Sequence, residues 1–489
     1  MRSIAIDPVT RLEGHGKIQI FMGDDDQVAN VYLQIPEIRG FEQFCVGRPV
    51  EEVPRIVPRI CGVCPAAHHL AAAKAVDAVY HVDIPAAAKK LRELFYSCYY
   101  FYDHTLHFYY LGGPDFVVGP TAPPAKRNVL GVIEVVGLEI GKAVIANRKM
   151  GQDMQILIAG KSTHPVWAIA GGVSKGLKPA DVEVLQANAK KAIDFAQFSL
   201  KVFGDIVLKN QAYVDLILSP EYRLEIGDMG LVDANNKVNF YDGLVRVKDA
   251  KGREVAKYAP KDYLANVAEH VEPYSYLKYP FLKARGWKGF VEGPETSIYR
   301  AIPLSRLNAA DGMATPRAQE HYQQLYETLG GRPAHQTLAI HWARLVELLY
   351  AAERWAELAN DPEILSDDIH RIPTATPTEG VGIVEAPRGT LTHHYTTDER
   401  GILTKVNLIV GTTNNNAPIC MSVKKAAQQV LKGCTGDPAQ GLLNMVEMAF
   451  RAYDPCFSCA THSLPGQMPL EVTIRDPQGD VVERLAQYV

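Results

Sequence analysis

Two Cys-x-x-Cys pairs lie near opposite ends of this chain, Cys61-Gly-Val-Cys64 and Cys456-Phe-Ser-Cys459. The spacing of three residues within a pair lets a turn or a first helical turn point both sulfurs toward one ion. Because thiolates bind soft or borderline metals, the two pairs predict a site with four thiolates. In zinc ribbons the second pair follows about 15 to 20 residues after the first, whereas 392 residues separate Cys64 from Cys456 here. Only the fold of the whole chain can close such a site.

The composition is that of an ordinary globular protein. Of its 489 residues, 47% are hydrophobic and 22% are charged, so the chain can bury a sizeable core. We expect one large folded unit over residues 1–489. Eight cysteines are too few for a disulfide scaffold, and a Cys-x-x-Cys pair in a cytosolic protein is more often a metal or redox site.

Several functional classes are disfavoured by what the sequence lacks. A formal net charge of −4 is not the basic footprint of a nucleic-acid binder. The start has no signal-peptide pattern, and no run of about 18 apolar residues occurs. Neither of the glycine-rich nucleotide-binding motifs is present. We therefore expect a cytoplasmic protein that has no membrane span and binds neither nucleic acid nor nucleotide.

The pattern of apolar residues predicts an α+β fold with a mainly helical body. Residues 3–35 alternate apolar and polar positions, which predicts an antiparallel sheet in an N-terminal region over 1–50. Mixed turns and short strands predict an inserted α/β lobe over 222–300, so that small sheets lie at the periphery of a long central helix bundle. The segments with helical spacing are 50–110, 129–155, 179–203, 335–360, 423–431 and 442–453, and short strands are expected at 237–240 and 402–410.

The neighbours of the cysteines distinguish two kinds of metal site. A structural four-cysteine zinc site that joins the ends of a scaffold protein is the simplest possibility. The cysteines lie, however, in Arg59-Ile-Cys-Gly-Val-Cys-Pro-Ala-Ala-His68 and Asp454-Pro-Cys-Phe-Ser-Cys-Ala-Thr-His462, which are rich in ionisable residues. A structural site needs only thiolates, so these residues indicate proton chemistry beside a metal.

Both segments resemble, in full, the two signatures of the large subunit of nickel-iron hydrogenases, R-x-C-G-x-C-x-x-x-H and D-P-C-x-x-C-x-x-H. The resemblance covers essentially the whole chain. It extends to Arg11-Leu-Glu-Gly-His15, Arg39-Gly-Phe-Glu42, Asp103-His104-Thr-Leu-His107 and Glu385-Ala-Pro-Arg-Gly389. It implies reversible cleavage of H2 into protons and electrons. A quinone-linked subunit of complex I type shares this ancestry but has lost the cysteines, all four of which are kept here.

The resemblance also implies separate roles for the cysteines. Cys61 and Cys456 are expected to be terminal ligands of nickel, whereas Cys64 and Cys459 bridge nickel to iron. Carbon monoxide and cyanide are expected to be the remaining ligands of the iron. Cys459 is further expected to accept the proton released from hydrogen, and Glu13 to pass it onward. The alternatives for Glu13 are a helix cap or a salt bridge to Arg11.

A buried arginine and its neighbours are expected to hold the diatomic ligands. Arg388, after Pro387, resembles the guanidinium that lies over the open metal position and hydrogen-bonds a cyanide, a task that suits a planar fork of donors. Asp103 and Asp454 resemble the carboxylates that orient it, although either could be a helix cap. Thr412 lies where the family has a hydroxyl bonded to the second cyanide, but its loop departs from the commoner pattern.

Three further residues complete the expected site. Glu42 and His462 resemble ligands of a divalent ion, usually magnesium, that ties the C-terminal segment to the core; an imidazole is a less usual ligand for magnesium. His68 resembles a histidine close to the metals and to the cluster of a neighbouring subunit. The remaining cysteines, which match no ligand motif and are expected to be buried thiols, are Cys45, Cys98, Cys420 and Cys434.

Electrons must leave such a site through other proteins. The chain has no ferredoxin-type cysteine spacing and thus no iron-sulfur cluster of its own, so a partner subunit with iron-sulfur clusters is required. The segment Gln34-Ile-Pro-Glu-Ile-Arg-Gly-Phe-Glu42 and Pro65 resemble the soluble, cytoplasmic, multimeric group of these enzymes. NAD(P), ferredoxin, a deazaflavin and a heterodisulfide are the candidate acceptors. We favour a complex with flavin-containing and further iron-sulfur subunits, in which electrons are bifurcated between NAD(P) and ferredoxin.

A C-terminal extension over 463–489 follows the second signature. Related large subunits are made with a short tail after the last histidine, and a dedicated protease removes it once nickel is inserted. Here the residues at 470–474 and 481–482 predict two strands joined by a turn. The extension is therefore either a removable tail or a lasting part of the fold.

Overall fold

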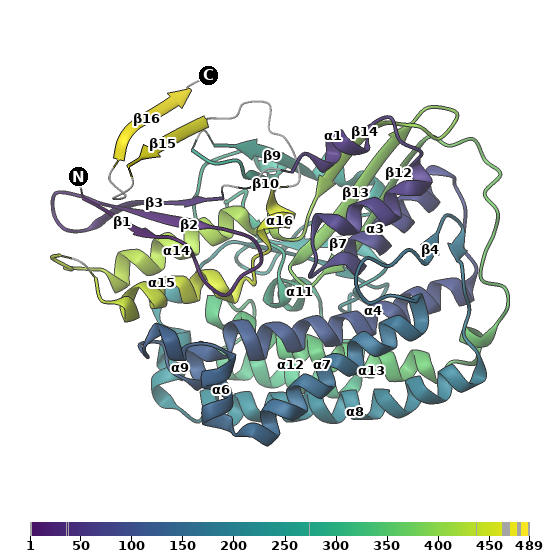
Figure 1. Ribbon diagram of the computed structural model, residues 1–489, viewed down its shortest axis with the longest axis horizontal. Coiled ribbons are helices and arrows are strands. Elements are labelled where there is room, and N and C mark those ends of the chain that lie inside the picture. The colour runs from purple at the N-terminus through teal and green to yellow at the C-terminus, as the bar shows by residue number, and fades with distance from the viewer. Residues whose placement is uncertain are drawn as a thin grey trace.

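The computed structural model describes residues 2–35, 37, 39–272, 274–436, 438–461, 470–476 and 481–487, and it confirms the predicted α+β fold. Long helices form one layer, drawn along the lower side of Figure 1, and small sheets with shorter helices lie above them. The long helices are α4 (Ala86–Leu106), α7 (Leu138–Ala159), α8 (Pro179–Phe203), α12 (Pro316–Leu329) and α13 (Ile340–Ala359).

Helix α13 forms the core of the helical layer. The helical spacing over 335–360 predicted this helix, and every side chain from Ile340 to Ala352 is buried. The reason is that α4, α8 and α12 all pack against it, and a helix enclosed by other helices has no solvent face. Polar residues on α13, such as Arg344 and Glu347, consequently lie inside the protein, where they can contact other buried groups.

Helix α3 (Pro65–Val79) packs across a three-stranded antiparallel sheet of β12 (Glu379–Ala386), β13 (Gly389–Thr397) and β14 (Leu403–Ile409). Two glycines of β12 allow the close approach. A Cβ at Gly380 would lie 2.4 Å from the carbonyl oxygen of Ala75, and one at Gly382 would lie 2.2 Å from that of Ala71. This contact fixes α3, and with it the first cysteine pair at its N-terminus.

The N-terminal sheet is antiparallel, as predicted, and has the order β1-β2-β3 (Ser3–Ile6, Lys17–Met22, Val28–Gln34). Ile18, Ile20 and Met22 alternate with less buried residues along β2 and bury one face. Strand β3 packs on α14 (Asn416–Val430), so purple and green-yellow segments lie side by side in Figure 1. The loop between β1 and β2 carries Glu13 toward the C-terminal region.

The segment 222–300 contains two small sheets. One has the strand order β11-β6-β7-β8, with β11 parallel to β6, and β9 and β10 form a separate antiparallel pair. The strand expected at 237–240 is wrong, because only Val238 forms a bridge there, to Val232. The division into an inserted lobe stays a prediction. The bounds are β6 Gly227–Val232, β7 Leu244–Lys248, β8 Glu254–Tyr258, β9 Val267–Val271, β10 Lys278–Leu282 and β11 Tyr299–Arg300.

The C-terminal part begins with α14 and continues through α15 (Gln440–Ala452) to α16 (Phe457–Ala460), which lies at the centre of Figure 1. Beyond it, β15 (Leu470–Arg475) pairs antiparallel with β16 (Val481–Gln487), in agreement with the two strands expected. His462 lies outside the described residues. The other elements are α1 Phe41–Cys45, α2 Val53–Ile56, α5 Pro114–Val117, α6 Val129–Val136, α9 Gln211–Leu218, α10 Tyr263–Asn266, α11 Pro303–Ala309, β4 Ala168–Ile169 and β5 Gly172–Val173.

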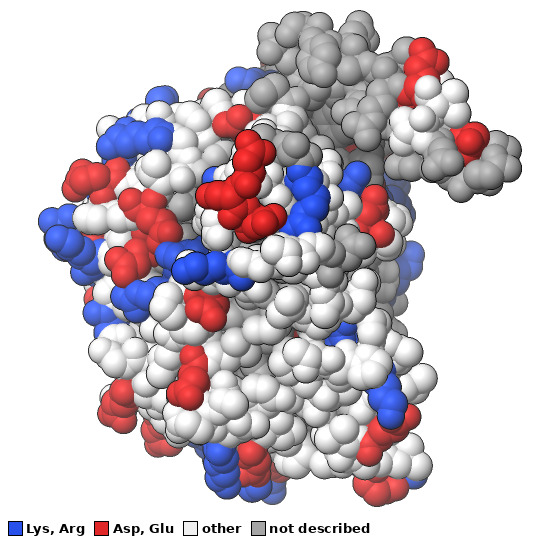
Figure 2. All heavy atoms as spheres, turned by 90° about the vertical axis from the view of Figure 1, so that its left-hand side faces the viewer, with Lys and Arg blue, Asp and Glu red and all other residues white. Residues whose placement is uncertain are grey.

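The outer surface is uneven in charge. Figure 2 shows charged side chains gathered in the upper half of one face, whereas the middle of the lower half is largely without them; α6 and α9 lie on this lower side in Figure 1. Leu130, Val135 and Leu138 are more than half exposed at α6 and the start of α7. Exposed apolar side chains that gather in this way are typical of surfaces that contact another protein. Among the described helices, none is long and apolar enough to cross a membrane.

Candidate active site

The four cysteines of the two pairs converge, although they come from opposite ends of the chain. Cys64 caps the N-terminus of α3 and Cys456 caps that of α16. Their four sulfur atoms all lie within 4.8 Å of one another and are buried. The Sγ of Cys61 is 3.1 Å from that of Cys456, and the Sγ of Cys64 is 3.1 Å from that of Cys459. The first cysteines of the pairs therefore face each other, as do the second ones.

Glu13 joins the N-terminal loop to the second cysteine pair. Its backbone carbonyl accepts a hydrogen bond from the Phe457 N–H at 3.0 Å, and its carboxylate accepts from the Cys456 thiol at 3.0 Å and from the Ser458 hydroxyl at 2.5 Å. Burial raises the pKa of Glu13 above its ordinary value. The contact differs from the expected one, because the sulfur beside Glu13 is that of Cys456 and not that of Cys459.

Arg11 does not form the salt bridge to Glu13 that was weighed as an alternative. Its guanidinium instead contacts the Asp115 carboxylate at 2.5 Å and the Leu111 carbonyl at 2.9 Å. Asp115 also pairs with Arg451 of α15 at 2.5 Å. The N-terminal loop is thereby fixed to α5 and α15, which leaves Glu13 available to the cysteines.

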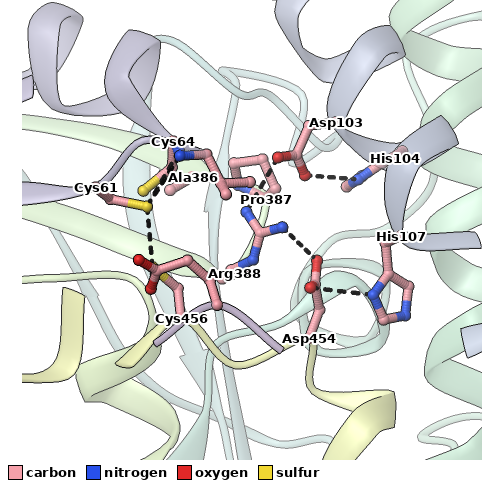
Figure 3. Close-up of polar contacts among 12 residues, drawn as sticks. Cys61, Cys64, Asp103, His104, His107, Ala386, Pro387, Arg388, Asp454 and Cys456 are labelled. Carbon is pink, nitrogen blue, oxygen red and sulfur yellow. Dashed lines mark hydrogen bonds and ion pairs between the residues drawn. The ribbon is translucent and has the colours of Figure 1, made fainter. Parts of the chain in front are cut away.

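Arg388 lies at the tip of the β12–β13 hairpin, in a loop of only two residues with Pro387 (Figure 3). Its guanidinium donates to Asp103 Oδ1 at 3.1 Å and pairs with Asp454 Oδ2 at 2.8 Å. All three charged groups are buried. Because burial opposes ionisation but both carboxylates favour it, the pKa of Arg388 lies well above its ordinary value. The expected arrangement of one arginine between two aspartates is present.

Each of the two aspartates has a histidine of α4 or of the turn after it beside it, as Figure 3 shows. Asp454 Oδ1 lies 3.0 Å from His107 Nδ1, and Asp103 Oδ2 lies 3.9 Å from His104 Nδ1. Asp454 has a positive φ of 53°, which is uncommon for a residue other than glycine. The backbone is thus bent so that its carboxylate reaches Arg388, and a simple helix-capping role does not describe either aspartate.

Thr412 and Asn415 hold the loop after β14 beside the cysteines. The hydroxyl oxygen of Thr412 accepts from the backbone N–H of Cys456 at 3.1 Å, so its hydrogen is available for another acceptor. The amide of Asn415 donates to the carbonyl of Arg388 at 2.9 Å. The unusual Asn414-Asn-Asn416 run after Thr412 therefore supports the hairpin tip, through the hydrogen bond of Asn415.

The remaining predicted site residues lie on two sides of the cysteines. His68 Nε2 is 3.6 Å from Cys459 Sγ. Glu42, in α1, accepts from the Leu408 N–H at 2.7 Å and lies 3.7 Å from Lys278 Nζ. Its predicted co-ligand His462 is not among the described residues, so the pairing of these two residues stays a prediction.

Sequence reasoning missed three residues that support the site. Ser458 contacts Glu13 but occupies a variable position of the signature. The roles of Arg306 and Glu385 are also visible only in three dimensions: Arg306 donates to the carbonyls of Ala386 and Pro387 at 2.9 and 3.3 Å, and it pairs with Glu385 at 3.1 Å. The match of Glu385 to a family segment was the only available signal.

The donor set fits a nickel-iron centre. Four sulfurs surround one position, and no carboxylate or imidazole of the described residues belongs to the same group of ligand atoms; thiolates of this kind suit soft or borderline metals. In addition, the Nε of Arg388 is buried without a hydrogen-bond partner among the described residues. A buried donor in this state indicates a missing acceptor beside the cysteines.

Comparisons with known proteins identify the family. The model of the nickel-dependent hydrogenase family matches residues 39–127 and 142–462, and a model described as HoxL-like matches residues 3–38. The stretch between the two parts of the first match contains α6 and the start of α7. The match ends at His462.

Curated relatives align over nearly their whole length. An iron-sulfur subunit of the F420-non-reducing hydrogenase of Archaeoglobus profundus is 48% identical over 100% of both chains. The NAD-reducing hydrogenase HoxS subunit beta of Cupriavidus necator is 39% identical and covers 99% of this chain and 100% of its own.

Solved structures show the same fold. A chain of an NAD+-reducing [NiFe]-hydrogenase in the H2-reduced state is 38% identical, covers 94% of this chain and 100% of its own, and has a TM-score of 0.88. The Ni-Fe-Se hydrogenase of D. vulgaris Hildenborough, at 24% identity and a TM-score of 0.72, shares the fold. The chain belongs to the nickel-dependent hydrogenase family and is the catalytic large subunit of a nickel-iron hydrogenase, with Cys61, Cys64, Cys456 and Cys459 holding the Ni-Fe site.

Proposed function

We propose that this large subunit exchanges electrons between H2 and a soluble acceptor through partner subunits, and that Cys456 and Glu13 handle the proton. When bound, a nickel-iron centre supplies heterolytic splitting of H2. The contact that carries the proposal is the one between the Glu13 carboxylate and the Cys456 sulfur, at 3.0 Å. A carboxylate at hydrogen-bond distance can take up a proton from that sulfur, so we assign to Cys456 the acceptor role that was expected of Cys459.

Glu13 then passes the proton toward the surface. The Ser458 hydroxyl and N–H both donate to it, which holds the carboxylate in one orientation. Glu37 lies close to the backbone of the next residue, Gly14: its carboxylate is 3.3 Å from the position that a Cβ on Gly14 would take. Glu37 contacts His15, whose side chain is 74% exposed. These groups form the outward route that we propose.

Arg388 and Thr412 hold the diatomic ligands of iron. The Nε–H of Arg388, which has no hydrogen-bond partner among the described residues, and the hydroxyl hydrogen of Thr412 are both donors, and cyanide is an acceptor. Asp103 and Asp454 keep the guanidinium in one orientation. Carbon monoxide, which accepts hydrogen bonds poorly, needs no such partner.

Glu42 and His462 bind magnesium or a similar divalent ion. The support is the half-buried Glu42 carboxylate beside β14, since hard cations prefer oxygen ligands. Such an ion would join α1 to the residues that follow α16, and so stabilise the closed form of the site.

The partner with iron-sulfur clusters docks near Cys61. A groove of about 560 Å3 opens next to the segment that leads into the first pair. Phe44 at its edge is 52% exposed, and the Nη1 of Arg39 donates to the carbonyl of Ile60 at 3.1 Å. An apolar groove rimmed by arginines suits a protein that carries an anionic cluster. Its lining is Arg39, Phe41, Phe44, Arg55, Ile56, Arg59 and Val166.

The final acceptor is NAD(P), ferredoxin or both, reached through flavin and further iron-sulfur subunits in the cytoplasm. The relatives named as NAD-reducing and as F420-non-reducing support this assignment and argue against F420. Bifurcation of the electrons between NAD(P) and ferredoxin is the form that we favour.

The extension over 463–489 is removed during maturation. The family match ends at residue 462, and the solved NAD+-reducing chain covers 94% of this chain but 100% of its own. The curated relative from Archaeoglobus, in contrast, spans the whole chain. Mass spectrometry of the native complex should find a C-terminus at His462; a mass that includes Val489 in the metal-loaded enzyme would contradict removal.

Purification of the complex from its native cells tests the function. We expect about one nickel and at least one iron per large subunit, infrared bands of metal-bound carbon monoxide and cyanide, and H2-dependent reduction of NAD(P) or ferredoxin but not of F420. Magnesium should be retained after gel filtration. One zinc per chain, without these bands and without dye reduction by H2, would contradict a functional nickel-iron site.

A further inference from the structure

A line of three buried side chains leads away from Cys459, one of the four cysteines of the site. The Nε2 of His68 lies 3.6 Å from the Cys459 sulfur, and its Nδ1 lies 3.2 Å from the Nε2 of His393. The Nδ1 of His393 lies 2.5 Å from the hydroxyl of Tyr395. His68, His393 and Tyr395 are each 0% exposed. The contacts form one continuous chain of hydrogen bonds that ends at a metal ligand.

The fold fixes the members of this chain independently of one another. His68 is in α3, whereas His393 and Tyr395 are two residues apart on β13, the middle strand of its sheet, and share one face. The neighbouring His394 points the other way and contacts Tyr263 at 2.9 Å. The close packing of α3 on Gly382 brings the two imidazoles together.

The charge of the sulfur decides the direction of these hydrogen bonds. A metal-bound cysteine is a thiolate and can only accept, so the Nε2 of His68 must carry its hydrogen. In a neutral imidazole the Nδ1 is then an acceptor, and the donor facing it is the Nε2–H of His393. The Nδ1 of His393 is in turn an acceptor and takes the hydroxyl hydrogen of Tyr395.

We propose that His393 and Tyr395 are positioning residues for hydrogen cleavage, which hold His68 in the tautomer that donates to the Cys459 thiolate. A hydrogen bond to a metal-bound thiolate would withdraw electron density from the sulfur and so reduce the electron density that the sulfur donates to the metal. Groups that hydrogen-bond to a metal's ligands orient them and tune the metal in this way. Burial raises the pKa of Tyr395 well above its ordinary value, so the phenol keeps the hydrogen that it donates.

The test is the infrared band of iron-bound carbon monoxide in the purified complex, and it rests on the carbon monoxide assigned under the proposed function. Tyr395→Phe removes only the hydroxyl. His393 can then take its other tautomer, in which its Nε2 accepts a hydrogen bond. His68 can then carry its hydrogen on Nδ1, so that its Nε2 faces the sulfur with a lone pair. We expect the carbon monoxide band to shift to lower wavenumber, because a more electron-rich sulfur increases back-donation from iron.

Two variants of His393 make the test specific. His393→Leu should shift the band as Tyr395→Phe does. His393→Gln should keep it near the unsubstituted position, because an amide can accept from Tyr395 and donate to His68. Tyr326→Phe is the matched control: it removes a buried hydroxyl that donates to Asn308 at 2.7 Å, and we expect no shift.

The band reports only on metal-loaded molecules, so partial loading does not affect its position. If His393→Leu fails to load, Tyr395→Phe decides the outcome. An unshifted band in Tyr395→Phe would overturn the inference, as would an equal shift in Tyr326→Phe. Absence of the band from the unsubstituted complex would instead contradict the proposed function, on which this inference depends.

Discussion

Glu13 is the residue at which the two ends of the chain meet. Its backbone pairs with Cys456 as an isolated parallel bridge, and its side chain contacts Cys456 and Ser458. Because backbone and side chain are held by the same short segment, the carboxylate cannot move away from the sulfur without breaking the bridge. Its chemical role and its structural role can still be separated by a substitution that preserves shape.

Glu13→Gln should lower H2 oxidation about 100- to 10,000-fold, the usual contribution of a positioned acid or base. The amide oxygen can still accept from Ser458, but the group no longer takes up and releases a proton. Nickel and iron per chain should stay unchanged. Dye reduction by H2 and metal analysis measure the two effects, and Glu139→Gln, whose side chain is 86% exposed, is the control. Full activity in the Glu13 variant would exclude it from the proton route.

At the residue scale, local patterns revealed the metal ligands but not their supporting contacts. The spacing of three residues within each pair identified the cysteines, and the family segments identified Glu13 and Arg388. Asp103 and Arg388, however, are 285 positions apart, and no periodicity links them. Arg11, next but one to Glu13 in sequence, pairs with Asp115 instead, since only the folded chain brings that carboxylate within reach.

The packing of α3 on β12 fixes the distance of the first cysteine pair from the sheet. Backbone atoms of the helix lie where the side chain of residue 382 would otherwise be. An added methyl group therefore cannot be accommodated by a rotamer change and must push the helix away. The small side chains of the alanine-rich helix and the glycines of the strand together allow this close approach.

Gly382→Ala should destabilise the protein by about 1–3 kcal/mol. Gly204→Ala, at the end of α8, is the control, because nothing lies within 4 Å of its Cβ position. Urea unfolding followed by circular dichroism gives both midpoints. Equal midpoints for the two variants would show that the helix can move without cost, and the contact would then not determine the site geometry.

Element prediction succeeded where end signals and periodicity agreed. The helix expected over 179–203 has those bounds in the structure, with Pro179 at its first position and the side chain of Asp181 accepting from the Lys178 N–H at 2.9 Å. The helix expected over 129–155 is two helices, because Gly137 has a φ of +92° and breaks it. Periodicity alone does not show such a break, since glycine also occurs inside helices.

At the scale of the molecule, Asp115 connects three distant parts of the chain. It lies between Arg11 of the N-terminal loop and Arg451 of α15, and Asn444 donates to it at 3.1 Å. Burial opposes its ionisation, but the two arginines outweigh this, and the pKa of Asp115 lies below its ordinary value. Its contribution to stability is therefore present at neutral pH and is lost as the pH falls through that lowered value.

Asp115→Asn should destabilise the protein by about 3–5 kcal/mol at pH 7, because it leaves two buried arginines with one carboxylate fewer. The difference from the unsubstituted protein should shrink in acid, below about pH 4, the ordinary pKa of an aspartate, because the carboxyl of the unfolded chain then binds protons while the native carboxyl, with its lowered pKa, still stays ionised. Thermal unfolding at a series of pH values measures this. A difference that stays constant down to pH 2 would contradict the assignment of the ionised form.

The four cysteines should also make the closure of the molecule depend on metal. A metal that binds the folded but not the unfolded chain stabilises the folded one, and here it joins segments near both ends. The metal-free chain should unfold at a lower temperature and be cut faster by protease after residue 455. Limited proteolysis with mass spectrometry compares the two forms. Identical fragment patterns would show that the fold closes without metal.

The bridge between Glu13 and Cys456 has a consequence for the order of biosynthesis. At about 5–20 residues per second, a ribosome needs roughly 20 to 80 seconds to proceed from the first cysteine pair to the second. During this time Glu13 lacks its partner Cys456, and half of the metal ligands do not yet exist. The helical layer and the sheet under α3 can form before the second pair is made, so the segment that closes the site is synthesised long after the segment that begins it. All four cysteines can hold nickel and iron only once the second pair has been made and has reached Glu13.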